Sequence, residues 1–479
     1  MTLDSLSYFL FLSLIYAAFY CSAARWRWLV LLAASYAFYA TFLEPRLLVI
    51  LGLVSAISYA CGLLLGGTKD EPRRLRLFWA GAAACVVILA AAKYSPALSA
   101  AAGGGTRALN LPISIGVSFF TVQALSYLAD VYLEMQEPER HLGYHALSLA
   151  FFPKLLQGPI ERAGDLLPQL RKTYVFDYNA ARSGMFLMEW GLFKKVVIAD
   201  RLALYVGPVY GDVHAYTGLP LIIATYAYSL QIYFDFAGYT DMARGAARLF
   251  GVDLTENFKT PYLAASIADF WRRWHISFSR WLLDYIFRPL QMEWRDRGRA
   301  GTALALIVTF LVSGIWHGTS WGIVVWGLFH GAYLAASVYY RPHQKKLHQW
   351  LGAAESQWLK TWQVFVTFHL VTFAWIFFRA ESLSDAWYVA KHIFDVHGSC
   401  VTARAMGLHD YIRDNVTMGR GGFAGCAAML LVPLAVYKVR DAFKFYEKPL
   451  LFRWAVYHIL FLTILLYHPS GHAFIYFRF

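Results

Sequence analysis

Long apolar runs separated by short polar segments are the main pattern of this chain. A helix that crosses a bilayer needs about 20 predominantly apolar residues, and runs near this length recur along the whole sequence. The pattern predicts about 11–12 transmembrane helices in an all-α, polytopic membrane protein, with residues 1–479 forming a single membrane domain. The candidate spans are residues 5–21, 27–43, 47–66, 77–94, 111–133, 184–207, 217–236, 301–316, 320–340, 362–379, 422–438 and 451–467.

Two segments in the middle of the chain depart from this regularity. Residues 141–157 and 238–251 are short for a span or are interrupted by Gly and Pro. Irregular backbone at membrane depth is tolerated only where protein buries it, so we expect re-entrant or half-helices there. Residues 157–159 (Gln-Gly-Pro) are expected to shape such a break. The long gap between spans at residues 380–421 is expected to be a structured loop.

The composition agrees with a membrane protein and excludes several other classes. Hydrophobic residues make up 58% of the chain and charged residues 15%, which is too apolar for a soluble protein of this length. The net charge of +13 is assigned to Lys and Arg in cytoplasmic loops that face lipid headgroups, so no nucleic-acid partner is expected. No two of the five cysteines form a CxxC pair, so neither a disulfide framework nor a metal site is expected.

The distribution of Lys and Arg predicts the orientation in the membrane. The basic loop at residues 69–76 should be cytoplasmic, and counting back three spans places the N-terminus outside. The first 20 residues contain no Lys or Arg, so residues 5–21 are interpreted as a retained helix and not as a signal peptide. Residues 259–300 contain eight Lys or Arg against four Asp or Glu and should also be cytoplasmic. The next span then runs outward and places His317 in the outer half or the middle of the membrane.

A charged helix is predicted over residues 268–290, because charged side chains recur there at spacings of 4, 7, 4 and 4. One interpretation is an interfacial helix with solvated arginines, and another is a cytoplasmic rim whose arginines attract the phosphates of coenzyme A. The two interpretations are compatible. His275 lies off this stripe and is expected to point inward. The stripe consists of Asp269, Arg273, Arg280, Asp284 and Arg288.

Polar and ionisable residues between positions 235 and 330 form the candidate site, because such groups at membrane depth normally face a polar cavity or a reaction path. His317 is the first candidate. It lies between Gly314 and Gly318, and small residues let a substrate approach an imidazole closely. An imidazole can act as a general base on a hydroxyl near neutral pH. The alternative is a hydrogen-bonded histidine packed between helices.

The other polar residues of this region each have a structural and a functional interpretation. His275 either orients a substrate or makes a structural hydrogen bond. Asp235 and Asp241 either cap helices and shape turns or line a polar tunnel. His330 is expected to be a packed or bridging histidine. The sequence contains no Walker A, Rossmann or HExxH motif, so the chemistry of those motifs is not indicated.

Four motifs occur in a recognisable order. They lie at residues 111–127, at 151–162 (Phe-Phe-Pro-Lys-Leu-Leu-Gln-Gly-Pro-Ile-Glu-Arg), at 235–277 (ending Phe-Trp-Arg-Arg-Trp-His-Ile-Ser) and at 313–331 (beginning Ser-Gly-Ile-Trp-His-Gly). In these motifs the chain resembles the membrane-bound O-acyltransferase (MBOAT) family over residues 110–335. The most similar branch is that of the bacterial alginate O-acetyltransferase membrane proteins, and the teichoic-acid D-alanylation proteins are a related branch.

The resemblance implies an MBOAT fold with a tunnel that joins a cytoplasmic donor side to an outer acceptor side. It implies transfer of acetyl from cytoplasmic acetyl-CoA, which is a substrate and not a resident cofactor, to an extracellular or periplasmic polysaccharide such as alginate. His317 matches the family histidine on which transfer depends, and His275 matches a second recurrent position that is His or Asn. The residues expected to line the tunnel are Asp235, Asp241, Asn257, Tyr262, Arg273, Ser313 and Trp316.

The resemblance also implies a location and partners. We expect a bacterial inner membrane, polysaccharide machinery nearby, and an exported SGNH-type acetyltransferase as a separate chain. Within the class, the alternatives are D-alanyl transfer to teichoic acid and fatty-acyl transfer to a lipid or protein. The alternative from another class is a proton-coupled transporter whose histidines and aspartates relay protons. Transporters often show internal repeats, which we do not find in this sequence.

Overall fold

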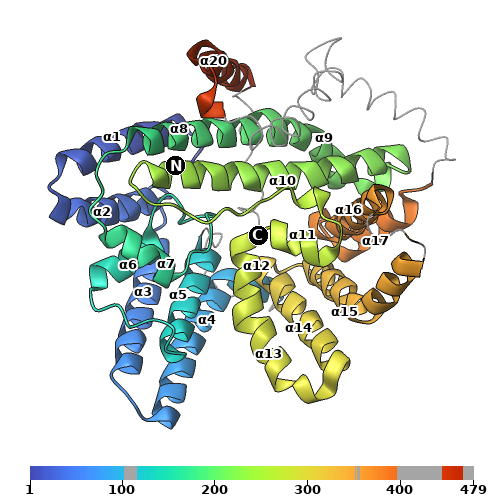
Figure 1. Cartoon of the computed structure of the whole chain (residues 1–479), viewed down its shortest axis with the longest axis horizontal. Helices are drawn as coiled ribbons and strands as arrows, with labels where there is room; N and C mark the ends of the chain where they lie inside the picture. The colour runs from blue at the N-terminus through green and yellow to red at the C-terminus, as the bar shows by residue number, and fades with distance from the viewer. Residues whose placement is uncertain (102–115, 351, 353–355, 396–444, 468–479) are drawn as a thin grey trace. The chain divides into compact units, whose positions relative to one another are not determined.

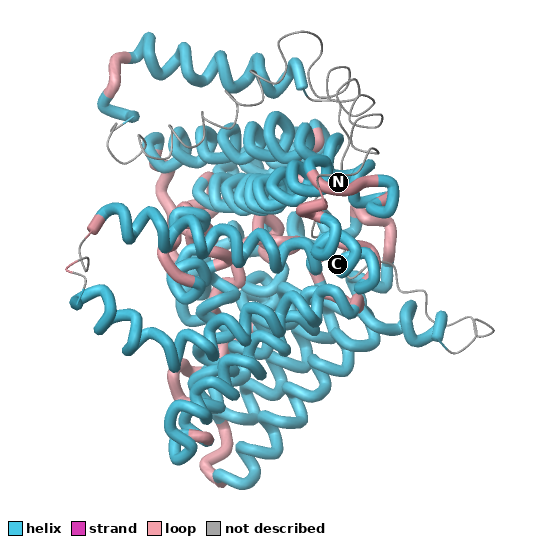
Figure 2. Tube along the Cα trace, turned by 90° about the vertical axis from the view of Figure 1, so that its right-hand side faces the viewer, coloured by secondary structure: helices cyan, strands magenta, loops and turns pink. Residues whose placement is uncertain are grey.

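The computed structural model of the chain describes residues 1–101, 116–350, 352, 356–395 and 445–467. Within these ranges the regular elements are all helical (Figure 2), which confirms the all-α prediction. They group into two compact units. The first contains Met1–Gly191 and Tyr239–Asn257, and the second contains Leu192–Gly238 and the described residues from Phe258 on. The single membrane domain stays a prediction.

Six of the described helices are long and apolar enough to cross a membrane, and α1 (Leu6–Cys21) is apolar but shorter. All six overlap spans expected from the hydropathy pattern, in agreement with a polytopic membrane protein. The candidate span 422–438 and residues 396–421 of the expected loop lie outside the described residues. The six helices cover Pro45–Gly66, Glu71–Tyr94, Arg295–His317, Trp321–Trp350, Gln357–Arg379 and Leu450–Tyr467.

The first unit is built from helices whose ends follow local sequence signals. The Ser5 hydroxyl caps α1 by accepting a hydrogen bond from the Tyr8 backbone N–H at 3.2 Å. Pro45 is the first residue of α3, where its missing N–H removes no helical hydrogen bond. The elements are α1, η1 (Ala24–Trp26), α2 (Arg27–Ala40), α3 (Pro45–Gly66), α4 (Glu71–Ala101), α5 (Val117–Tyr132), α6 (Leu142–Ala150), α7 (Ala163–Arg171) and most of α8 (Tyr178–Phe193).

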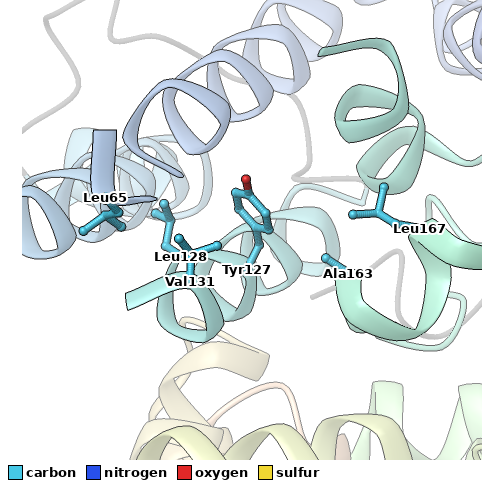
Figure 3. Close-up of a cluster of buried hydrophobic side chains, with 6 residues drawn as sticks. All are labelled: Leu65, Tyr127, Leu128, Val131, Ala163 and Leu167. Atoms are coloured by element: carbon cyan, nitrogen blue, oxygen red, sulfur yellow. The ribbon is translucent and has the colours of Figure 1, made fainter. Parts of the chain in front are cut away.

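The helices α3, α4 and α5 lie side by side in this unit (Figure 1). A cluster of buried side chains joins α3, α5 and α7, and Figure 3 shows the Tyr127 ring among its aliphatic members. The Tyr127 hydroxyl accepts a hydrogen bond from the Glu139 backbone N–H at 3.0 Å, so the polar end of this buried ring is satisfied. The cluster consists of Leu65, Tyr127, Leu128, Val131, Ala163 and Leu167.

The second unit contains the longest helices of the C-terminal half. Its elements are η2 (Lys194–Ala199), α9 (Asp200–Gly211), η3 (Val213–Ala215), most of α10 (Leu219–Arg248), η4 (Pro261–Leu263), α11 (Ile267–Arg273), α12 (Ile276–Leu282), η5 (Leu283–Phe287), α13 (Arg288–Glu293), η6 (Arg295–Arg297), α14 (Gly298–His317), α15 (Trp321–Trp350), α16 (Gln357–Arg379), α17 (Leu383–His392), η8 (Phe445–Glu447) and α20 (Leu450–Tyr467).

Helices α14 and α15 form a hairpin (Figure 1). Glycines on both helices let them pack closely. A Cβ atom on Gly327 would lie 2.4 Å from the Phe310 carbonyl oxygen and 3.1 Å from the Gly314 Cα. A Cβ atom on Gly314 would lie 2.9 Å from the Ile323 carbonyl oxygen. Small residues at a helix interface let two backbones approach closely in a membrane. The hairpin therefore sets the end of α14 firmly against the first turns of α15.

The observed helices can be compared with the predictions for three segments in the middle of the chain. The segment 238–251 is not a separate re-entrant piece, because α10 continues as one helix to Arg248. The predicted continuous helix 268–290 is wrong, because the chain leaves the helical conformation at Trp274 and His275 and contains a π-helical turn at η5. Within 141–157 the structure has α6, a short helix of nine residues, and the re-entrant character of this segment stays a prediction.

Candidate active site

His317 is the last residue of α14, and its side chain is 3% exposed. Its Nδ1 atom lies 2.7 Å from the Ser313 carbonyl oxygen, one helical turn earlier. A carbonyl oxygen only accepts hydrogen bonds, so the neutral ring carries its proton on Nδ1 and its lone pair on Nε2. The Ser313 hydroxyl is also near Nδ1, at 3.5 Å. The helix thus selects the tautomer in which Nε2 is the basic nitrogen.

Aromatic rings surround His317. The centroid of its ring lies 4.9 Å from that of Trp326, 5.4 Å from that of Phe278 and 5.7 Å from that of Phe378. Trp316 stacks on Phe278 with a centroid distance of 4.2 Å. An apolar enclosure of this kind excludes water and strengthens electrostatic interactions inside it.

His275 is the residue at which the predicted charged helix breaks. It occupies the left-handed region at φ 43° and ψ 53°, which is uncommon for a residue other than Gly, and it precedes the first residue of α12. Its side chain is 1% exposed, which confirms the prediction that it points inward. His275 lies outside the six apolar helices, and burial, with a smaller contribution from His317, lowers its pKa well below the ordinary value. Its imidazole is therefore neutral at pH 7.

The structure brings His275 and His317 to the same group of rings. The His275 ring lies 5.2 Å from Phe278 and 6.4 Å from Trp316, and both of these rings also contact His317. Phe236 of α10 contacts His275 from another side at 4.8 Å. Strained backbone of the kind seen at His275 often occurs at functional sites. Of the predicted site residues, His275, His317, Ser313 and Trp316 thus form one cluster.

His330 of α15 belongs to the same cluster. It is fully buried, and its ring lies 5.2 Å from Trp326. The Trp271 indole N–H donates a hydrogen bond to His330 Nδ1 at 3.2 Å, so the expectation of a packed and bridging histidine is confirmed. We define the histidine cluster as His275, Phe278, Ser313, Trp316, His317, Trp326 and His330.

Asp235 lies in a second buried polar group, which we call the lysine cluster: Lys195, Asp200 and Asp235. Lys195 Nζ lies 2.7 Å from Asp235 Oδ1 and 2.9 Å from Asp200 Oδ1, and the exposed fraction of each side chain is 5% or less. Asp235 is inside α10, so the capping interpretation is wrong for it. Lys195 was not among the predicted site residues, although a lysine within the apolar run 184–207 is itself a signal that a buried acid must accompany it.

Asp241 and Asn257 belong to the first unit. Asp241 also lies inside α10, so it does not cap a helix either. Its Oδ1 atom lies 3.4 Å from Arg244 Nη1, and the same guanidinium lies 3.8 Å from Glu256. Asn257 is 1% exposed. The lining of a tunnel by these residues stays a prediction.

Tyr262 and Arg273 have partners of their own in the second unit. The Tyr262 hydroxyl donates to the Ser229 carbonyl oxygen and accepts from the Trp375 indole N–H at 3.2 Å, so it links η4 to α10 and α16. Arg273 forms an ion pair with Asp269 at 3.0 Å and is partly exposed. Tunnel lining stays a prediction for both. Among the described residues, no group of three or more His, Cys, Asp or Glu side chains could hold a metal ion.

The fold and the site define a class: a helical, multi-pass membrane protein with a buried cluster of histidines, one of which carries a basic Nε2. Comparison with known proteins identifies the family. The model of the membrane-bound O-acyltransferase family matches residues 142–380. The chain belongs to this family, and the protein is an acyltransferase.

Similar proteins act on several polymers, as their names record. A probable alginate O-acetylase of Azotobacter vinelandii is 34% identical over 472 residues, which cover 92% of this chain and 85% of the relative. A peptidoglycan O-acetyltransferase of Helicobacter pylori is 32% identical over 361 residues, 68% of this chain and 66% of the relative. A teichoic acid D-alanyltransferase of Bacillus subtilis is 29% identical over 282 residues, 57% of this chain and 70% of the relative.

Proposed function

We propose that this O-acyltransferase takes acetyl from cytoplasmic acetyl-CoA and passes it across the membrane for O-acetylation of an extracytoplasmic polysaccharide such as alginate. The observation that carries the proposal is the hydrogen bond between His317 Nδ1 and the Ser313 carbonyl oxygen, since it leaves Nε2 as a general base in an apolar enclosure. The likeness to alginate O-acetylases over most of the chain supports the choice of acetyl and of a polysaccharide.

In the transfer step, His317 Nε2 removes the proton from the acceptor hydroxyl as its oxygen attacks the thioester carbonyl carbon. The new carbon–oxygen bond forms first, and the carbon–sulfur bond then breaks. The imidazolium returns its proton to the departing thiolate, so coenzyme A leaves as the free thiol and His317 is neutral again. General acid–base catalysis of this kind contributes about 10²–10⁴-fold to a rate.

His275 is proposed to orient the acyl donor beside His317. Its neutral imidazole shares two ring neighbours with His317, which supports a role at the same substrate. Arg273 and the arginines that follow it are proposed to attract the phosphates of coenzyme A at the cytoplasmic rim, because a guanidinium binds two phosphate oxygens at once. For Asp235, Asp241, Asn257 and Tyr262, tunnel lining is the second interpretation beside a structural role, and loss of turnover without loss of stability in their variants would favour it.

The proposed setting is the bacterial inner membrane, with the N-terminus on the periplasmic side. The proposed partner is an exported SGNH-type acetyltransferase that makes the final ester. The direct acceptor is then either a polysaccharide hydroxyl or a serine of that partner. A second candidate is D-alanyl transfer, which the likeness to teichoic acid D-alanyltransferases favours. The two candidates differ in their donor, acetyl-CoA or an aminoacylated carrier protein.

The experiment that tests the proposal measures release of free coenzyme A from acetyl-CoA by the purified protein in proteoliposomes, with and without an acceptor. His317→Ala is expected to lower acceptor-dependent turnover by about 10³-fold. His458→Ala is the matched control, because His458 makes the same Nδ1 contact with the carbonyl four residues earlier, at 2.8 Å, but is exposed on α20. The control should keep wild-type turnover.

Two results would count against the proposal. Equal turnover by His317→Ala and the wild type would remove His317 from the reaction. Absence of turnover by the wild type with acetyl-CoA, together with turnover of a D-alanyl carrier protein, would select the second candidate.

A further inference from the structure

Two buried N–H groups of α15 have no hydrogen-bond acceptor among the described residues: Trp326 Nε1 and the Nε2 side of His330. The side chains are 1% and 0% exposed. A buried donor left without an acceptor costs about 1–3 kcal/mol, so native proteins keep few of them. Two such groups one helical turn apart, in the cluster that holds His317, indicate a position where an acceptor from outside the chain binds.

The tautomer of His330 follows from its contact with Trp271. An indole N–H can only donate, so His330 Nδ1 is the acceptor in their 3.2 Å hydrogen bond. The neutral ring of His330 therefore carries its proton on Nε2. This is the opposite tautomer to that of His317, whose proton is on Nδ1. The cluster thus combines one basic nitrogen from α14 with two N–H donors from α15.

Trp326 contacts both His317, which carries the basic nitrogen, and His330, which carries the second N–H donor. Its ring contacts His317 at 4.9 Å and His330 at 5.2 Å, in both cases edge to face. Residues four apart on a helix share a face, so α15 presents Trp326 and His330 together. The close approach at Gly327 holds this face of α15 against α14.

We propose that Trp326 Nε1–H and His330 Nε2–H donate hydrogen bonds to the carbonyl oxygen of the acyl group during transfer. The inference rests on the acyl transfer proposed above and adds the groups that stabilise the negative charge on the carbonyl oxygen of the acyl group. As the acceptor oxygen bonds to the carbonyl carbon and its proton passes to His317, the π electrons of the carbonyl move onto its oxygen. The two donors stabilise that oxyanion until the carbonyl re-forms and the thiolate leaves. Removing one such donor typically costs about 10²–10³ in kcat.

Trp326→Phe is the sharpest variant, because it deletes the N–H and keeps an aromatic ring. We expect kcat to fall by about 100-fold while the KM for acetyl-CoA stays near the wild-type value. The melting temperature in detergent should fall less than in Trp375→Phe, since both variants lose buried ring volume but Trp326 gives up no hydrogen bond. Trp375→Phe is the control: its N–H already bonds to the Tyr262 hydroxyl, so this change should lower the melting temperature and keep kcat.

His330 gives a second and independent pair of variants. Gln offers an N–H near the position of Nε2, whereas Leu offers none, so His330→Gln should retain much more turnover than His330→Leu. Wild-type kcat in Trp326→Phe would overturn the proposal, and so would equal loss in the Gln and Leu variants of His330. An increase in the KM for the acceptor alone would assign the donors to ground-state binding and would also overturn it. Turnover by the wild type and its loss in His317→Ala test the acyl transfer separately.

Discussion

The second unit holds two buried polar clusters that differ in how completely they are paired. In the lysine cluster, a single ammonium group contacts two carboxylates at hydrogen-bond distance. In the histidine cluster, the polar atoms are set among aromatic rings, and two N–H groups have no acceptor among the described residues. Both clusters contain residues that sequence reasoning treats as functional, because charge or imidazole at membrane depth is costly.

The difference teaches that buried polarity alone does not mark a reaction site. A buried ion group whose members satisfy one another is stabilised by the protein itself. A buried donor with no acceptor in the chain is stabilised when a ligand or an ordered water provides one. The histidine cluster is therefore the better candidate for chemistry, and the lysine cluster for structural stability. The variants below test this division, in order of the expected loss of folding free energy.

Lys195→Met should have the largest effect on stability. It leaves Asp200 and Asp235 buried without their shared cation, and breaking a buried ion pair in this way typically costs about 3–5 kcal/mol. We expect a much lower melting temperature in detergent. Adding Asp200→Asn and Asp235→Asn should recover part of the loss, because neutral amides tolerate burial better than carboxylates. If Lys195→Met folded normally but lost turnover, the lysine cluster would belong to the reaction path.

Much of this picture could be predicted from the sequence, because the signals are local. Apolar runs near bilayer length predicted the six long helices. The glycines beside His317 predicted room for a close approach, which α15 occupies at Gly314 in the structure. The inward position of His275 was predicted from its place off the charged stripe, although the continuous helix assumed for that stripe is wrong. Each of these inferences needs only the periodicity of a helix and the sizes of neighbouring side chains.

The rest depends on contacts between distant segments. No Gly or Pro marks the break in the helix at His275, so the spacing of charged residues predicted one continuous helix there. In the structure, burial of Trp274 and His275 against other elements overrides helix propensity. The partners of Lys195 lie five and 40 residues away along the chain. The two tautomers are set by one contact within a helix and one contact between α11 and α15, of which only the first could have been inferred from spacing.

Tyr262→Phe should have the next largest effect, and it tests whether a fully paired group outside the lysine cluster is also structural. The change removes the hydroxyl that joins the Ser229 carbonyl oxygen to the Trp375 indole N–H. It leaves a buried donor without its acceptor, which costs about 1–3 kcal/mol. We expect a lower melting temperature with kcat per folded molecule unchanged. A fall in kcat with the melting temperature retained would show that Tyr262 acts on the substrate, as a tunnel residue would.

His275 should show the smallest loss of stability and the clearest separation of stability from activity. Its backbone is left-handed, a conformation that Asn adopts more readily than Ala, for which the cost is roughly 1–2 kcal/mol. His275→Ala should therefore melt earlier than His275→Asn, while both raise the KM for acetyl-CoA by removing the imidazole.

The pKa of His275 lies well below its ordinary value, so folding buries a neutral ring that the unfolded chain protonates below about pH 6.5. Wild-type stability should fall as the pH drops below that value, and the fall should be smaller in His275→Asn. The alternative result is that the stability of the wild type and of His275→Asn depends on pH in the same way and that the KM for acetyl-CoA is unchanged. It would show that His275 has no part in the function of the histidine cluster, and His317, Trp326 and His330 would remain as its functional members.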